Sequence, residues 1–319
     1  ALDRLTEGAA RMHLPSPAAT PRFGPADLQP GDVLLMMGEG PLSDLIAWAS
    51  GSRYSHAAIV VDGGDLVEAS ASGVRRYSLA TRLADQANYH WIDALRWHDG
   101  GGTALATADA ACVLARATAL LGIAYPIDQL ALFGAIMAVR GRWPVHPLAR
   151  WLVRIALDRA LPDHSDRMVC SEVVYRAYAE CAAVPTGRLA PAIVPGPRGS
   201  APFPDVDWEA LWQEIGPALR NPPRTGLRAA VPAADAGIGF DGVPPDLEAV
   251  GMIDDAELEA ARVAVLGQGA ALRVAGGPLQ AVAAGPVLPR PNPRLVSPQD
   301  LAASPSLGML GRLMQRATG

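Results

Sequence analysis

A cysteine precedes a stretch with helical spacing in the segment RMVCSEVVYRAYAECAAV, residues 167–184. Nucleophilic cysteine chemistry requires a thiolate, a base and a group that orients the base. The start of a helix favours a thiolate, because unpaired N–H groups and the positive end of the helix dipole lie there. Cys170 has this position, and Ser171 and Glu172 support a helix start. Taken alone, such a cysteine is more often a small buried residue.

The base candidate is His56 in YSHAAIVV, at the start of a predicted strand. Glu68 follows 12 residues later in LVEAS, and an even separation keeps both side chains on one face of a hairpin. A turn centred on Asp62 sets the two residues directly opposite each other. A carboxylate beside a histidine orients the ring and stabilises its charged form. The alternative is a surface hairpin with an ordinary His and Glu.

The elements that would position these groups follow from apolar runs and alternation. Strands are predicted at 31–37, at 89–97, and twice within 55–70 around an Asp-Gly-Gly turn. Helices are predicted at 41–50, 103–122, 126–139, 147–161, 170–184 and 254–266, with a helical patch in DVDWEALWQEIG. The sum is an α+β protein with a small, mostly antiparallel sheet and helices before and after it.

Composition divides the chain of 319 residues, which is 50% hydrophobic and suits one to two domains. We predict a Pro/Ala-rich lead-in over 1–28, a core over 29–184, a Pro/Gly/Ala-rich insertion with short helices over 185–290, and a C-terminal segment over 291–319. The net charge of −5 comes from mixed acids and bases, so no nucleic-acid partner is expected.

The three cysteines match neither a disulfide framework nor a metal-binding pattern, and we predict reduced thiols. Cys112 and Cys181 fall inside predicted helices and are expected to be structural. No signal-like N-terminus and no run of 18 apolar residues is visible, so a cytoplasmic protein is expected. The first residue is Ala, which leaves a processed N-terminus open, and export as an effector is the alternative.

In their order along the chain, GDVLL, SHAAIVVDGGDLVEA and CSEVVYRAY resemble the circularly permuted papain-like branch of the NlpC-type cysteine hydrolases. The YiiX-like members look most similar. The resemblance implies a permuted papain-like fold in which the cysteine helix packs against a small antiparallel sheet. It implies Cys170 as nucleophile, His56 as base and Glu68 as the orienting residue. LVSPQDLAASPSL also resembles a segment of YiiX-like proteins, which implies that residues 291–319 pack back on the core.

Further candidates surround this trio. Tyr125 falls where the family has a tyrosine near the site, and Tyr125 and Ser171 are candidate oxyanion or substrate contacts; a packed aromatic is the alternative for Tyr125. The family often has an Asp soon after this Tyr, but here Pro126 intervenes and Asp128 is displaced. His164 is the competing base, six residues before Cys170.

The predicted reaction is acyl transfer through a thioester at Cys170, cutting an amide, peptide or (thio)ester bond, with no cofactor or metal required. A lipid-directed acyl hydrolase or an acyltransferase of the lecithin–retinol-acyltransferase-like type is the alternative. It is favoured by residues 130–161, an apolar stretch with interspersed Arg and Trp that suits a membrane interface, although a helical pair packed on the core explains it equally. A non-catalytic binding module is a second alternative, and the oligomeric state is not predicted.

Overall fold

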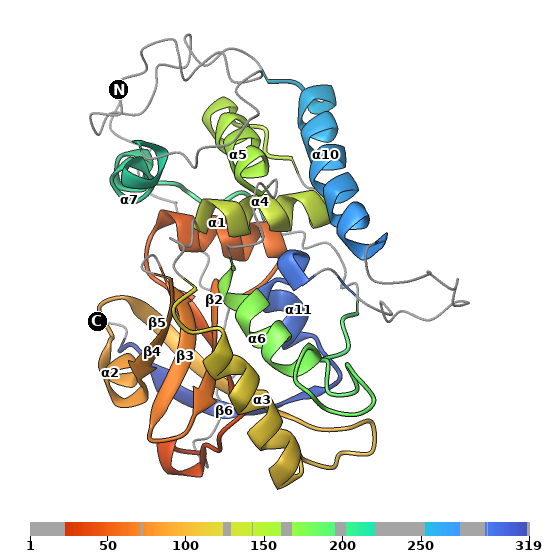
Figure 1. Ribbon diagram of the computed structural model, residues 1–319. Helices are drawn as coiled ribbons and strands as arrows, with labels where there is room; N and C mark the ends of the chain where they lie inside the picture. Colours follow the sequence, from red (N-terminus) through yellow and green to blue (C-terminus); the bar gives the residue numbers. More distant parts are fainter. Residues whose placement is uncertain are drawn as a thin grey trace.

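The computed structural model describes residues 23–70, 73–123, 129–141, 143–160, 168–194, 202–220, 253–274, 291 and 293–317. Within these ranges, six strands form one antiparallel sheet in the order β4-β3-β2-β1-β5-β6 (Figure 1). The strands are β1 (Val33–Gly38), β2 (His56–Val61), β3 (Asp65–Ser70), β4 (Gly73–Ser78), β5 (Tyr89–Trp97) and β6 (Leu307–Gln315). Helices pack against the sheet, so the α+β class is confirmed.

The central strands are apolar on both faces because each face has its own core. Val33 and Leu35 of β1 point into the larger core, which the helices cover. Leu34 and Met36 point the other way, into a smaller core. A strand buried on both faces is a continuous apolar run rather than an alternating one. This explains the sequence VLLMM.

The helices of the larger core are α1 (Pro41–Ser50), α3 (Thr107–Ala119), α4 (Gln129–Arg140), α5 (Pro147–Ala160), α6 (Cys170–Ala179), α7 (Trp208–Arg220) and α10 (Asp255–Val274). Short turns of helix complete the described chain: η1 (Pro25–Asp27), α2 (Leu79–Ala84), η2 (Pro293–Leu295) and α11 (Pro298–Ala302). The predicted helices are confirmed, although α6 ends before residue 184 and α10 extends beyond residue 266. Apolar side chains of α7 and α10, in the Pro-rich segment, are part of the larger core.

The sequence-based prediction omits the strands β4 and β6 and the short helical turns η1, α2, η2 and α11. Strand β4 (GVRRYS) has two adjacent arginines, α2 has only six residues, and β6 (LGMLGRLMQ) contains two glycines. β4 and β6 are the edges of the sheet, where polar and glycine residues interrupt the alternation that identifies a buried strand. Edge position is therefore the physical reason for the two missed strands.

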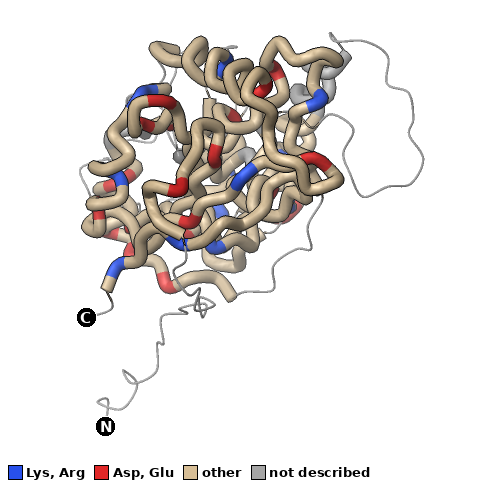
Figure 2. The backbone as a smooth tube through the Cα atoms, turned by 90° about the horizontal axis from the view of Figure 1, so that it is seen from below, with Lys and Arg blue, Asp and Glu red and all other residues tan. Residues whose placement is uncertain are grey.

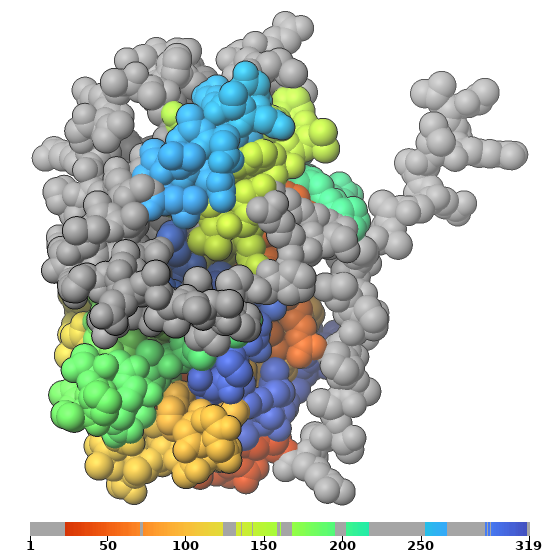
Figure 3. Space-filling model, turned by 90° about the vertical axis from the view of Figure 1, so that its right-hand side faces the viewer, coloured from red at the N-terminus to blue at the C-terminus, as the bar shows by residue number. Residues whose placement is uncertain are grey.

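The arginines of residues 130–161 that the structure describes bind acids or carbonyls of the protein. Arg140 pairs with Asp300 at 3.2 Å, and both side chains are buried. Arg150 pairs with Asp255 and Arg154 with Glu257. These ion pairs fasten α5 to α10, and the two helices lie side by side in Figure 3. The apolar side chains of both helices fill the larger core. These contacts favour the interpretation of α4 and α5 as a packed helical pair.

The distribution of charged residues and the hydropathy of the helices are further features of the described chain. Acidic and basic positions are interspersed along the described backbone (Figure 2). In the part of the chain that the structure describes, no helix combines the length and the apolar character needed to cross a membrane.

Gly134 lets α4 approach α5 closely, and its replacement is expected to destabilise the fold. A Cβ at this position would lie 1.8 Å from the carbonyl oxygen of Ala156, a backbone atom that cannot rotate away. We expect Gly134→Ala to lower the free energy of unfolding by about 3 kcal/mol, measured by urea denaturation. Gly100→Ala is the matched control, since a Cβ there meets no atom within 4 Å. Equal stability of the two variants would contradict this close packing.

Candidate active site

The hairpin of β2 and β3 carries His56 and Glu68 on one face, as predicted, but in a different register. Glu68 pairs with Ala58, so it lies diagonal to His56 rather than directly opposite it. The predicted turn centre at Asp62 was wrong by one residue, because Gly63 and Gly64 both adopt positive φ values (78° and 75°) and the loop centres on Gly63. A shift of the pairing by two residues leaves the faces unchanged. His56 Nε2 lies 3.2 Å from Glu68 Oε2.

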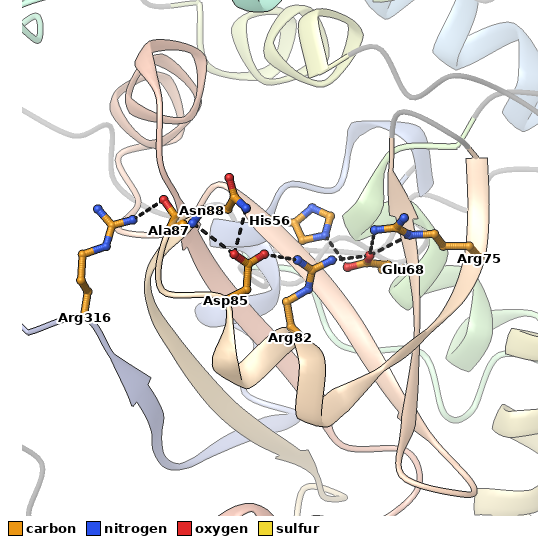
Figure 4. A network of polar contacts seen from close by, with 8 residues as sticks. All are labelled: His56, Glu68, Arg75, Arg82, Asp85, Ala87, Asn88 and Arg316. Atoms are coloured by element: carbon orange, nitrogen blue, oxygen red, sulfur yellow. Dashed lines mark hydrogen bonds and ion pairs between the residues drawn. The ribbon is translucent and has the colours of Figure 1, made fainter.

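Glu68 is fully buried, and its two carboxylate oxygens bind different residues (Figure 4). Oε1 accepts hydrogen bonds from Arg75 Nε (3.0 Å) and Nη2 (2.8 Å) of β4 and from Arg82 Nη2 (2.5 Å) of α2. Oε2 faces His56. A buried carboxylate is tolerated only when it is paired and hydrogen-bonded, and here both conditions are met.

Cys170 is the first residue of α6, which packs against β2 and β3. Glu172 Oε2 accepts a hydrogen bond from Val169 N at 3.3 Å, and Arg176 Nε holds the other oxygen of Glu172 at 2.7 Å. These contacts fix the start of the helix, as the acid in the predicted first turn suggested. Cys170 lies near enough to His56, the first residue of β2, for the two side chains to interact electrostatically. The structure thus brings Cys170, His56 and Glu68 together.

The electrostatics of the site favour charged forms of His56 and Glu68. Burial lowers the pKa of His56, but the neighbouring Cys170 and Tyr89 and hydrogen bonds to Cys170 and Glu68 outweigh it, so the pKa lies well above its ordinary value of 6.5. Burial raises the pKa of Glu68, but contacts with His56, Arg82 and Arg75 lower it to about 2. The His56 ring therefore lies between the Glu68 carboxylate and Cys170, in surroundings that favour its protonated form.

Of the remaining candidates, only Ser171 lies in the described part of the chain. The Ser171 hydroxyl is buried and donates to the carbonyl of Val296 at 2.6 Å, which ties η2 to α6. This bond uses the hydroxyl proton of Ser171, and the role of Ser171 as an oxyanion or substrate contact stays a prediction. Tyr125, Asp128 and His164 lie outside the described residues.

Sequence reasoning missed three residues of the site: Arg75, Arg82 and Tyr89. Arg82 lies over the rings of Tyr77 (4.6 Å) and Tyr89 (4.7 Å), and the Tyr89 ring lies 6.3 Å from that of His56. The sequence signal for a cation near Glu68 was Glu68 itself, because a buried acid in an apolar strand requires a partner. The next segment, GVRRYS, contains Arg75.

A cavity of about 360 Å³ lies away from these residues, and none of Cys170, His56 and Glu68 lines it. Its walls include Trp97 and His98 at the end of β5 and the ion pair of Arg188 with Asp109. Within the described ranges, no group of three or more His, Cys, Asp or Glu side chains is placed to hold a metal ion.

Comparison with known proteins gives a partial structural likeness. No family model matches the sequence, and no curated protein matches it significantly. The crystal structure of the metalloprotein YiiX from Escherichia coli O157:H7 is similar over 48% of this chain, with 21% sequence identity and a TM-score of 0.33. The matched part spans 66% of that protein's chain, slightly less than two-thirds.

Proposed function

We propose that the protein is a cysteine hydrolase of the permuted papain-like type, in the YiiX-like branch, that cuts an amide, peptide or (thio)ester bond. The observation that carries the proposal is the position of His56, which interacts electrostatically with Cys170 and whose Nε2 lies 3.2 Å from Glu68 Oε2. A nucleophile, a base and an orienting acid in this order form the arrangement that nucleophilic catalysis requires.

The reaction proceeds in two steps. The Cys170 thiol gives its proton to His56, and the sulfur attacks the carbonyl carbon of the substrate. The bond to the leaving amine or alcohol breaks, and His56 returns the proton to that group, leaving a thioester. Water then attacks the thioester while His56 takes its proton, which restores the thiol and releases an acid. Since Nε2 faces Glu68, Nδ1 is the nitrogen of His56 that exchanges this proton.

The start of α6 supplies the complementary electrostatics. The backbone N–H of Cys170 is at the first helical position, where an N–H group has no acceptor within the helix. Such a donor at the positive end of the helix dipole suits the oxyanion that forms when sulfur attacks a carbonyl.

Selective alkylation tests the nucleophile. We expect limiting iodoacetamide to label Cys170 ahead of Cys112 and Cys181, as read by peptide mass spectrometry, because the charged His56 favours a reactive sulfur beside it. Cys112 is the internal control, since it is more exposed than Cys170. Preferential labelling of Cys112, or equal labelling of all three, would contradict the proposal.

The class of acyl donor can be identified by offering the protein two kinds of substrate, peptides and lipids. Incubation with cell-wall peptide fragments and with phospholipid vesicles, each followed by mass spectrometry of the products, distinguishes a peptidase or amidase from a lipid-directed enzyme. The ion pairs that bind Arg150 and Arg154 to α10 favour the peptide or amide donor, because these arginines already have partners within the protein.

A further inference from the structure

The guanidinium group of Arg82 lies beside Glu68 and is held in place by several contacts. The Arg82 side chain is only 5% exposed, and its two terminal nitrogens bind different acids: Nη2 lies 2.5 Å from Glu68 Oε1 and Nη1 lies 3.3 Å from Asp85 Oδ2. Its guanidinium carbon lies 4.6 Å from the centre of the Tyr77 ring and 4.7 Å from that of the Tyr89 ring. A planar guanidinium that binds two acids and lies over two aromatic rings has little freedom to rotate.

The second arginine on Glu68 is held less firmly. Arg75 binds the same oxygen, but its side chain is 38% exposed and it stacks on Tyr77 alone among the described rings. Solvent screens an exposed cation more than a buried one. Of the two arginines, Arg82 should therefore contribute more to the position and charge of the carboxylate.

Fixing Oε1 has a consequence for Oε2. With one oxygen held by two guanidinium groups, the carboxylate cannot rotate without losing three hydrogen bonds, so Oε2 stays directed at His56 Nε2. The ring of Tyr89 links the two parts, since it contacts Arg82 on one side and lies beside the His56 ring. Figure 4 shows this continuous chain from Asp85 through Arg82 and Glu68 to His56.

We propose that Arg82 is a positioning residue of the cysteine hydrolase: by fixing Glu68 Oε1 it directs Oε2 to His56 and keeps the carboxylate charged. The inference rests on the proposed function. After the contacts with His56, the charge of Arg82 is among the causes that lower the pKa of Glu68 to about 2. His56, Arg75 and Arg82 are the charged groups that face Glu68 from β2, β4 and α2.

Arg82→Met tests the inference with two independent measurements. We expect kcat for p-nitrophenyl acetate, an activated ester, to fall about ten-fold with little change in KM, the effect of losing one charge-assisted hydrogen bond that orients the base. We also expect the Glu68 carboxyl to titrate at a higher pH than in the wild-type protein, as followed by carbon-13 NMR of labelled glutamate and assigned with Glu68→Gln. A residue that only supports the fold would not move this titration.

Two further variants complete the experiment. Arg82→Lys keeps the charge but cannot bridge both acids, so Glu68 should titrate near its wild-type position while kcat stays reduced. Arg76→Met on the same strand as Arg75 is the control and should leave both measurements unchanged, because Arg76 is exposed and pairs with Asp65 rather than with Glu68. If Arg82→Met does not fold, the kcat of Arg82→Lys alone tests the positioning role of Arg82.

The inference is overturned by wild-type kcat in either Arg82 variant, or by a reduced kcat in Arg82→Met with an unchanged Glu68 titration. Failure of the proposed function gives a different result: the wild-type protein would then form no acetyl adduct on Cys170. A normal adduct in the wild-type protein together with unchanged Arg82 variants would contradict the positioning role alone.

Discussion

Cys170→Ala is expected to lower the hydrolysis of p-nitrophenyl acetate by roughly four orders of magnitude or more, because Cys170 is the proposed nucleophile that forms the acyl-enzyme. The fold should survive, since the buried Cys170 side chain is small and alanine leaves α6 intact. Steady-state rates give the size of the loss. Intact-mass spectrometry after brief exposure to the ester should show an acetyl adduct on the wild-type protein and none on the variant.

Cys112→Ala provides the matched control for this experiment. Cys112 is on α3 and is partly exposed, and it makes no described contact with His56 or Glu68. Its replacement should leave both the rate and the adduct unchanged. An acetyl adduct that persists in Cys170→Ala would place the nucleophile elsewhere in the chain and contradict the proposed mechanism.

The elements that carry the three candidate residues could be predicted because their signals are local. Residues 55–70 have the apolar runs and the Asp-Gly-Gly turn of a hairpin, and CSEVVYRAY has helical spacing with an acid in its first turn. The even separation of His56 and Glu68 correctly placed them on one face, since this depends on strand periodicity alone. Their diagonal register depended on the backbone angles of Gly63 and Gly64, which the sequence leaves open.

The surroundings of the site could not be predicted because they depend on long-range packing. The contact of Cys170 with His56 requires α6 to dock on β2, more than a hundred residues away along the chain. Arg82 reaches Glu68 from a six-residue helix that carries too few residues for a periodic signal. β6 pairs with β5 across a separation of over 200 residues, and neither its glycines nor its polar residues predict a strand.

Glu68 should also matter for stability, and the sign of its pH dependence follows from its pKa. The folded-state pKa of about 2 lies below the ordinary value of 4.5, so the folded protein holds the charged form more tightly than the unfolded chain does. The corresponding stabilisation is about 3 kcal/mol. It is fully present above about pH 4.5 and is lost as the pH falls toward 2.

Glu68→Gln is therefore expected to lower the free energy of unfolding by about 3 kcal/mol at pH 7, because Arg75 and the buried Arg82 lose the charge that neutralises them. Urea denaturation at several pH values should show this difference shrinking to roughly half or less near pH 3, where the wild-type protein loses part of the same contribution. Asp65→Asn is the matched control on the same strand, since its exposed pair with Arg76 should contribute at most about 1 kcal/mol. The neutral amide introduced by Glu68→Gln cannot stabilise the imidazolium of His56, so kcat should fall with stability at pH 7. A stability difference that is independent of pH would show that the charge of Glu68 is not its source.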